Sequence, residues 1–462
     1  MTTVCEKGKC TGCMECIDVC PKKAIKVIDS WMEYNAVIDS EKCIQCNACH
    51  SACQNNAEQV LTKPIYWTQG WAQDDCVRMR SSSGGVATAV ERAFIKNGGI
   101  VCSCTFSFGK FEFDFAETED EVCKFTGSKY VKSNPEGVYK KILEKLKLGR
   151  KVLFIGLPCQ VSAVRHYTKN HQNLYTADLI CHGTPSPQIL DSFLFDYGIR
   201  LTEIQSIRFR EKNNFKLEQN GKRFAVPITT DNYLMTFLNS TTYTENCYQC
   251  QYAKIERSGD ITLGDSWGSE LEKSIQDKGI SLVLCQNEKG KELIDQADLT
   301  LVDVDLKKAI ESNHQLYQPS QKPKQREVFF KELKKGYGFK KAVKRCYPKK
   351  YLKNIVKTVL YNMKFIGGGR TANVGMLVMS VSLLKSVRFE RLDAGLLLTE
   401  GVPDEKDTTA VRFIGRLYVQ HTSKNNVVLE KGYTAFNRCV NAFSVSIFAL
   451  IALAIISIFL GL

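Results

Sequence analysis

The sequence predicts three parts: an α+β domain, an α/β domain with a mainly parallel sheet, and a C-terminal extension that ends in one transmembrane helix. Three observations predict this arrangement. They are two cysteine-rich runs near the start, alternating strand-like and helix-like segments after them, and an uncharged apolar stretch at the end. The length of 462 residues leaves room for about two or three domains. We expect the first two parts to cover residues 1–60 and 61–350. The extension should consist of a basic and uncharacterised segment, residues 351–442, and the transmembrane helix, residues 443–462.

Two cysteine runs of identical spacing define the first part. The run Cys10-x2-Cys13-x2-Cys16-x3-Cys20 recurs 33 residues later and ends in Cys53. In a bacterial-type ferredoxin, three thiolates of one run and the last thiolate of the other hold each [4Fe–4S] cluster. A zinc site or a disulfide scaffold is the alternative, but zinc needs only four thiolates and usually pairs two CxxC motifs. The spacing therefore predicts a ferredoxin-like domain that carries two [4Fe–4S] clusters.

The expected ligands cross between the two runs. Cluster one should use Cys10, Cys13, Cys16 and Cys53, and cluster two should use Cys43, Cys46, Cys49 and Cys20. The residue that follows each run differs, since Pro21 follows the first run and Gln54 follows the second. Twenty cysteines, in a chain whose first nine residues are mostly polar and charged, indicate a reducing compartment in which thiols serve metals.

After a linker expected at residues 61–75, strand-like and helix-like segments alternate. This βαβ rhythm predicts a parallel sheet with ligands at the carboxyl ends of its strands. Residues 81–85 open a helix-like stretch, and free N–H groups there suit a phosphate, although Ser and Gly also form an ordinary N-cap and turn. The strand-like segments are residues 99–104, 151–156 and 175–180, and the helix-like segments are residues 86–94, 137–148 and 160–169.

Four further cysteines lie where this sheet should bind ligands. Cys159 follows one strand-like segment, Cys181 follows the next, and Cys247 and Cys250 form a CxxC motif. Four thiolates are enough for a third [4Fe–4S] cluster. The alternative is that Cys159 and Cys181 are inert buried thiols, while the CxxC motif binds zinc or nothing.

The charge of the chain points to a membrane and not to nucleic acid. The formal net charge is +14, but residues 331–370 alone contain 13 Lys/Arg and one acidic residue, with apolar and basic positions at helical spacing. Such a helix lies readily on an anionic membrane surface, although a solvated basic face is the plainer interpretation. The 20 residues 443–462 carry no charge and match the thickness of a bilayer, although a buried core helix is the alternative. Lys/Arg upstream favour a body in the cytoplasm, held by a C-terminal anchor.

Five ordered motifs carry a family resemblance over about residues 1–350. They are Ser81-Ser-Ser-Gly-Gly85, Thr126-Gly-Ser-Lys-Tyr130, Pro158-Cys-Gln160, Cys181-His-Gly183 and the segment 258–268. In these motifs the chain resembles the coenzyme F420 hydrogenase/dehydrogenase beta-subunit family, with a ferredoxin fused in front. The resemblance implies FAD beside an iron–sulfur cluster held by Cys159, Cys181, Cys247 and Cys250. It also implies that the flavin is lined by Ser81, Ser82, Ser83, Gly84, Gly85, Gly127, Ser128 and Lys129.

These parts predict an iron–sulfur flavoprotein oxidoreductase. Clusters carry single electrons, whereas a flavin also exchanges a hydride with a second substrate, either an F420-like deazaflavin or another hydride acceptor. The expected partners are a redox protein that gives or takes electrons and a small-molecule substrate. His182 is a candidate proton donor or a shield for the cluster, and Asp260 and Asp265 either bind flavin hydroxyls or cap a turn. The alternative function is a membrane-tethered electron-transfer subunit without its own substrate.

Overall fold

The computed structural model describes residues 2–56, 58–363, 387–392 and 395–400. The chain divides into two compact units, and each is described by itself. The first comprises Met1–Val226 and Thr230–Pro348, and the second comprises Pro227–Thr229 and Lys349–Leu462. Both cysteine-rich parts of the chain lie in the first unit.

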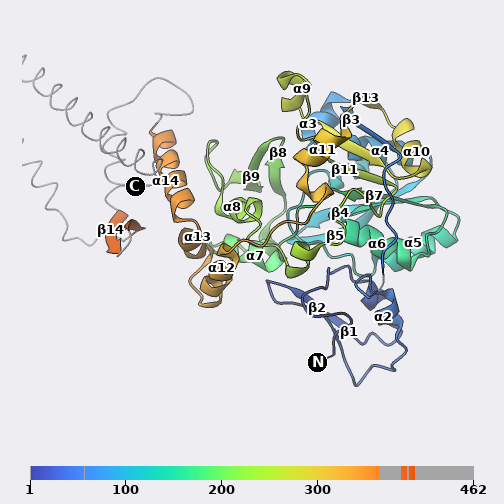
Figure 1. Cartoon of the computed structure of the whole chain (residues 1–462), viewed down its shortest axis with the longest axis horizontal. Helices are drawn as coiled ribbons and strands as arrows, with labels where there is room; N and C mark the ends of the chain where they lie inside the picture. Colours follow the sequence, from blue (N-terminus) through green and yellow to red (C-terminus); the bar gives the residue numbers. More distant parts are fainter. Residues whose placement is uncertain (1, 57, 364–386, 393–394, 401–462) are drawn as a thin grey trace, which may run out of the picture. The chain divides into compact units, whose positions relative to one another are not determined.

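The N-terminal domain is an α+β structure, as the cysteine spacing predicts (Figure 1). An antiparallel hairpin lies beside two short helices. Each helix follows a residue in the left-handed conformation, Met14 with φ 61° and Asn47 with φ 62°. These residues occupy the same position in the two cysteine runs, so the sequence repeat produces a backbone repeat. The elements are α1 (Glu15–Asp18), β1 (Ile25–Asp29), β2 (Tyr34–Ile38) and α2 (Ala48–Ala52).

An eight-stranded sheet of order β13-β3-β12-β11-β7-β6-β4-β5 forms the centre of the α/β domain within the described residues (Figure 1). Its middle strands β11, β7, β6 and β4 run parallel to one another. The strands on both flanks pair antiparallel. The predicted α/β class is confirmed, with its parallel strands at the centre. The strands are β3 (Tyr66–Ala72), β4 (Ile100–Ser107), β5 (Lys110–Ala116), β6 (Val152–Gly156), β7 (Leu174–Leu179), β11 (Ile261–Asp265), β12 (Ser281–Cys285) and β13 (Leu299–Val302).

Helices cover both faces of this sheet. Successive strand residues point to opposite faces, so Val101 packs in one core while Ile100 and Cys102 pack in the other. Burial of both faces explains why the parallel strands are apolar throughout instead of alternating. The helices on one face are α4 (Val86–Lys96) and α10 (Glu288–Asp295), and those on the other are α5 (Val138–Lys147) and α6 (Pro158–Tyr167).

The expected linker at residues 61–75 is wrong, because it contains strand β3. This strand pairs with β12 on one side and β13 on the other. Its first residues, Tyr66 and Trp67, are exposed, and Thr68 and Gln69 are buried polar residues. The usual alternation of apolar and polar residues is therefore missing. Its partners also lie more than 200 residues along the chain, where no local pattern can reveal them.

The remaining part of the first unit packs around aromatic side chains. Phe193 lies 5.4 Å from Phe339 and 5.9 Å from Tyr233 between ring centroids. This part also contains a three-stranded sheet of order β10-β9-β8. The elements are α3 (Asp75–Arg80), α7 (Pro187–Phe195), β8 (Ile207–Glu211), β9 (Asn214–Gln219), β10 (Lys222–Arg223), α8 (Asn232–Leu238), α9 (Lys273–Asp277), α11 (Leu306–Ser312), α12 (Gln325–Lys334) and α13 (Phe339–Cys346).

The described part of the C-terminal extension contains a helix and a hairpin. Helix α14 (Pro348–Asn362) forms in the basic segment, and β14 (Val387–Leu392) pairs antiparallel with β15 (Gly395–Glu400). Among the helices of the described residues, none combines the length and the apolar character needed to cross a membrane. The predicted anchor, residues 443–462, lies outside the described residues.

Candidate metal centres and cofactor site

Three of the four cysteines expected at cluster one, Cys10, Cys16 and Cys53, pack in the core of the N-terminal domain, and Cys13 packs against the core of the α/β domain. Cys10, Cys13, Cys16 and Cys53 are all buried. Burial and the neighbouring Cys13, Cys10 and Cys53 together raise the pKa of the Cys16 thiol. Charges influence one another mainly at short separation. The fold therefore brings the crossed ligand set together, with Cys53 of the second run beside the first run.

The cysteines expected at cluster two lie nearer to solvent. Cys46 is exposed, whereas Cys20, Cys43 and Cys49 are half-buried. Burial, together with the nearby Cys20 and Cys43, raises the pKa of the Cys49 thiol. The backbone N–H of Ala24 donates to the Cys20 sulfur at 3.2 Å. This set is therefore also assembled from both runs, but at the surface of the domain.

The fold also brings together the four cysteines of the α/β domain. Cys159 lies in the first turn of α6, after β6, and Cys181 follows β7. Cys247 lies in a 3₁₀ helix, Glu245–Gln249, and Cys250 follows it. Burial, Cys247 and Cys250 raise the pKa of Cys181 to about 12. Burial, together with the nearby Cys250 and Cys181, likewise raises the pKa of the Cys159 thiol. The segments that follow the carboxyl ends of the parallel strands β6 and β7 thus lie close to the CxxC motif.

Each of the three cysteine sets has four thiols, the number that a [4Fe–4S] cluster takes. Among the described residues, no three His, Cys, Asp or Glu side chains converge as they would around one metal ion. A [4Fe–4S] cluster differs, because each of its four thiolates binds a separate iron. Four thiols from two or three segments are therefore the kind of donor set that a cubane would take, and Cys46 is the member that the structure leaves exposed.

The two small-residue loops expected at the flavin contact each other. The Ser128 N–H donates to the Ser82 hydroxyl at 2.8 Å. Gly85, with φ 85°, is the N-cap of α4, and no side chain caps this helix. The hydroxyls of Ser81 and Ser83 donate to backbone carbonyls at 2.7 and 2.8 Å, so they hold the loop in place. The uncapped N–H groups of α4 therefore lie at the junction of the two loops, where they suit a phosphate.

Gly84, Gly127 and Lys129 complete this pair of loops. A Cβ on Gly84 would lie 2.4 Å from the Gly70 carbonyl of β3, so the residue permits a close approach of two backbones. Gly127 has φ 91° and open space around it. The Lys129 ammonium donates to the Phe125 carbonyl at 2.6 Å, and burial lowers its pKa. The Lys129 side chain is therefore held in place beside the loops.

Three further cations near these loops were not predicted from the sequence. The buried Lys212 ammonium donates to the Ser83 carbonyl at 2.9 Å. Its pKa is lowered to about 8 by burial and by the nearby Arg78 and Arg210. Arg210 forms an ion pair with Asp265 at 2.6 Å. An excess of buried positive charge favours the binding of an anion. The three cations beside these loops therefore fit the diphosphate of FAD. No local pattern marks these residues, because each comes from a different segment.

His182 directly follows Cys181, and its side chain is exposed. The surrounding protein atoms and the neighbouring His314 lower its pKa to about 4, so the imidazole is neutral near pH 7. The Gln315 side-chain nitrogen lies 2.7 Å from His182 Nδ1, which therefore accepts, and the proton of the ring lies on Nε2. A proton donated by His182 would come from this neutral ring. The two hypotheses for this residue, proton donor and shield, remain predictions.

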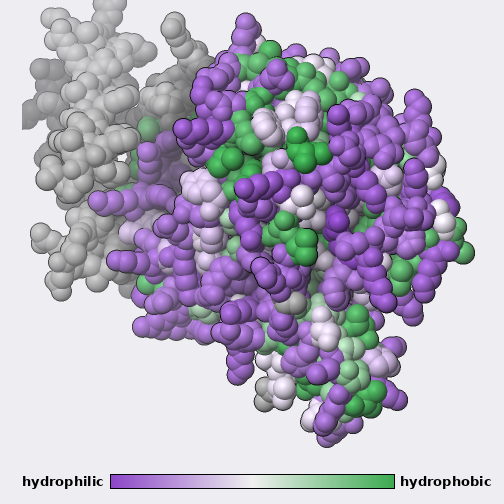
Figure 2. Space-filling model, turned by 45° about the vertical axis from the view of Figure 1, so that its right-hand side comes forward, coloured by the Kyte–Doolittle hydropathy of each residue, from purple (hydrophilic) through white to green (hydrophobic). Residues whose placement is uncertain are grey.

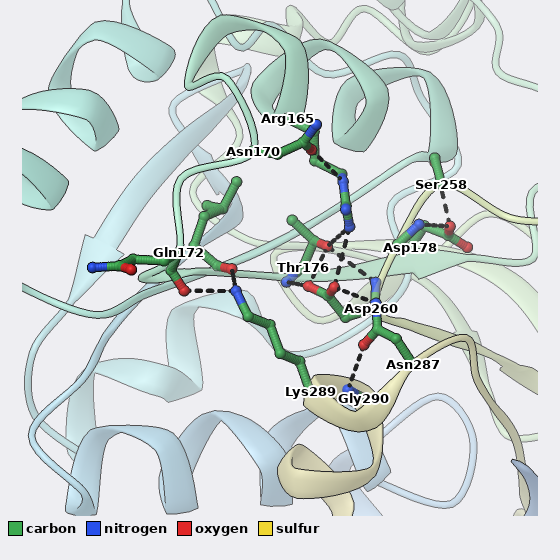
Figure 3. Close-up of polar contacts among 12 residues, drawn as sticks. Arg165, Asn170, Gln172, Thr176, Asp178, Ser258, Asp260, Asn287, Lys289 and Gly290 are labelled. Carbon is green, nitrogen blue, oxygen red and sulfur yellow. Dashed lines mark hydrogen bonds and ion pairs between the residues drawn. The ribbon is translucent and has the colours of Figure 1, made fainter. Parts of the chain in front are cut away.

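The Asp260 carboxylate is surrounded by hydrogen-bond donors of the protein itself (Figure 3). Its carboxylate accepts hydrogen bonds from the Thr176 N–H at 2.7 Å, from Arg165 at 3.1 Å and from the Asn287 amide at 2.8 Å. Asp260 directly precedes β11, and Thr176 lies in β7. These bonds occupy the carboxylate within the protein, which favours the turn-capping alternative over flavin binding. Asp265 is likewise occupied by Arg210.

A buried ion pair braces the same two strands. Asp178 of β7 and Arg257 are 0% and 1% exposed, and their side chains lie 2.9 Å apart. Asp178 also accepts from the Gly259 N–H at 2.9 Å and from the Ser258 hydroxyl at 3.4 Å. The beginning of the motif 258–268 therefore holds β11 against β7, near the strand ends that carry Cys159 and Cys181.

Two family models match the chain. Residues 149–305 match the model described as the C terminus of the coenzyme F420 hydrogenase/dehydrogenase beta subunit. Residues 9–60 match the 4Fe-4S dicluster domain. The predicted resemblance is confirmed over both ranges. The chain is an iron–sulfur protein of the oxidoreductase type, related to F420 hydrogenase/dehydrogenase beta subunits.

A solved structure gives a more distant comparison. It is a chain of the F420-reducing [NiFe] hydrogenase complex from Methanosarcina barkeri, 21% identical to this protein. The alignment covers 66% of this chain and 94% of that chain, with a TM-score of 0.41. No match was found among the curated proteins.

Proposed function

We propose that this chain is an iron–sulfur flavoprotein oxidoreductase that exchanges electrons between a redox protein and a small-molecule substrate. The observation that carries the proposal is the proximity of two cysteine sets. Cys13 of the N-terminal domain is close enough to Cys159 of the α/β domain to contribute to the raised pKa of the Cys159 thiol. When bound, FAD would exchange single electrons with the clusters and a hydride with an F420-like deazaflavin or another acceptor.

The residues that would hold these groups fall into two classes. The three cysteine sets would each hold one [4Fe–4S] cluster. The loops 81–85 and 127–129 would hold the flavin, with its diphosphate at the N-terminus of α4. Lys129, Arg78 and Lys212, which donate to backbone carbonyls nearby, would add positive charge around it. Asp178 and Arg257 keep the strands beneath the third cysteine set in place. His182 would position or protonate the reacting molecule.

The exposure of the two ferredoxin-type sets gives the proposed order of electron transfer. The set containing Cys46 lies at the surface, and the set containing Cys13 lies against the α/β domain. Figure 2 shows hydrophobic residues at the surface of the N-terminal domain, at the bottom of the view. Ile44, which is 56% exposed between Cys43 and Cys46, is one of the apolar residues on that surface. We propose that a redox protein docks here and that electrons cross inward from this side.

Iron, sulfide and flavin analysis of anaerobically purified protein tests the proposal. Three clusters and one flavin predict about twelve iron and one FAD per chain. About eight iron without flavin would reject the flavoenzyme and leave an electron-transfer subunit without its own substrate. FAD content and iron content are measured separately, so each part of the proposal stands or fails alone.

We also propose that the body of the protein is held at the cytoplasmic face of a membrane. The uncharged residues 443–462 and the basic segment 331–370 support this. Deletion of residues 443–462 should release the protein from membrane vesicles. A deleted chain that still sediments with vesicles of anionic lipid, but not with neutral ones, would assign the attachment to the basic segment instead.

A further inference from the structure

The two cysteine runs end in different residues, and the difference has a structural role. Gln54 stands where the first run has Pro21, and it is 4% exposed. Its side-chain amide donates to the Cys159 carbonyl at 2.9 Å and to the Thr11 hydroxyl at 3.3 Å. The Tyr252 hydroxyl donates to its side-chain oxygen. Gln54 thus connects the loop of Cys53 to the loop of Cys159, which a proline could not do.

Lys132 makes a second crossing between the same two domains. It is 4% exposed, and its backbone N–H donates to the Pro185 carbonyl at 2.9 Å, near the loop of Cys181. Its ammonium reaches the N-terminal domain, where it donates to the Thr11 carbonyl at 3.0 Å and lies 5.2 Å from the ring centre of Tyr34. Thr11 lies between Cys10 and Cys13, so this ammonium stands between two cysteine sets.

The charge of Lys132 faces thiols and not carboxylates. Within the part of the chain that the structure describes, no carboxylate forms an ion pair with Lys132. Its ammonium is held at the Thr11 carbonyl, next in the chain to Cys10, and its backbone is bonded to Pro185 near Cys181. A buried ammonium is unfavourable unless negative charge lies nearby. Thiolate-bound clusters on both sides would supply that negative charge.

We infer that Gln54 and Lys132 form a polar junction between the set of Cys10, Cys13, Cys16 and Cys53 and the set of Cys159, Cys181, Cys247 and Cys250. Gln54 fixes the separation of the two sets. Lys132 raises the reduction potential of the clusters that they hold, because a positive charge stabilises the more negative reduced form. This inference rests on the proposed function. Both are positioning residues, since neither is itself a ligand.

Lys132→Met tests the electrostatic part, because methionine keeps most of the length and removes the charge. We expect unchanged iron content and lower reduction potentials for the inner clusters in a titration followed by electron paramagnetic resonance. The potential of the outer cluster, held by the set containing Cys46, should stay as in the wild type. Lys124→Met is the matched control, since that lysine pairs with Asp114 at the surface. Wild-type potentials in Lys132→Met would overturn the inference.

Gln54→Leu tests the separation of the two sets. We expect full iron content but a weaker magnetic interaction between the reduced inner clusters, and slower electron transfer between them. Gln188→Leu is the control, because it removes a contact with Trp31 that also joins the two domains, away from the cysteines. An unchanged interaction in Gln54→Leu, or an equal change in the control, would contradict the role of Gln54. Loss of iron would show instead that Gln54 shapes a ligand loop.

The outcome separates this inference from the proposed function. About eight iron in the wild type would remove the third cluster and with it the proposed enzyme. In that case Lys132→Met would still have to lower the potential of the cluster bound by Cys10, Cys13, Cys16 and Cys53. If it did not, the junction would fail as well.

Discussion

The N-terminal domain and the α/β domain assemble their cysteines in opposite ways. The first uses two short runs, residues 10–20 and 43–53, in which spacing alone places most of each set. The second gathers Cys159, Cys181 and a distant CxxC motif from separate segments. A local set depends on the conformation of its own loop. An assembled set depends on every strand and ion pair that holds its segments together.

Replacement of Arg257 should break the assembled set and spare the local ones. Arg257→Met leaves Asp178 buried without its partner, which should lower the free energy of unfolding of the α/β domain by about 3–5 kcal/mol. Denaturant unfolding followed by tryptophan fluorescence measures this. Arg223→Met is the control, since that arginine is 39% exposed and its ion pairs should contribute less than about 1 kcal/mol. An equally small effect of Arg257→Met would contradict the structural role of this ion pair.

Replacement of the CxxC motif should remove only the assembled set. Cys247→Ser with Cys250→Ser should reduce the iron content by about four per chain, while about eight remain in the ferredoxin-type sets. Cys285→Ser is the matched control, because this thiol is buried in strand β12 away from the other cysteines. Unchanged iron in the double variant would reduce the α/β set to inert thiols.

The smallest expected effect concerns the pH dependence of the α/β domain. Burial raises the pKa of Glu91 in α4 to about 8, although Lys129 opposes the shift. The folded state therefore holds a proton that the unfolded chain releases near pH 4.5, so stability should fall as the pH rises from about 4.5 to 8. Glu91→Gln should remove about 1–3 kcal/mol of this fall between pH 5 and pH 8.

Denaturant unfolding at the two pH values checks this prediction. Glu112→Gln serves as the control, because that carboxylate is exposed on strand β5. A wild-type slope in Glu91→Gln would mean that another group causes the pH dependence. The result also bears on the flavin loops, since Lys129 belongs to one of them.

Regular segments of the fold were predicted better than irregular ones. The strands β4, β6 and β7 and the helices between them follow from continuous apolar runs and helical periodicity. Strand β3 was missed, because its polar residues Thr68 and Gln69 are buried against segments far along the chain. Sequence patterns report local preference, and a strand whose apolar face is incomplete carries little of that signal.

The candidate site shows the same limit. Cysteine spacing predicted the ligand sets, and the family resemblance predicted that the loops 81–85 and 127–129 line the flavin. Arg78 and Lys212 were missed, because a buried cation has no sequence pattern of its own. The role of Asp260 could not be decided from the motif, and the donors to its carboxylate come from three residues, Thr176, Arg165 and Asn287.

The sequence by itself determined the chemistry of this protein, because cysteine spacing dictates which loops can hold a cluster. It also determined the symmetry of the two runs. Only the tertiary structure decided that the set containing Cys46 lies near solvent while the set containing Cys13 lies against the α/β domain. It also decided that Gln54 and Lys132 connect the N-terminal domain to the α/β domain. Spacing acts through a few backbone torsions within one loop. The environment of a side chain depends instead on segments that only packing brings together.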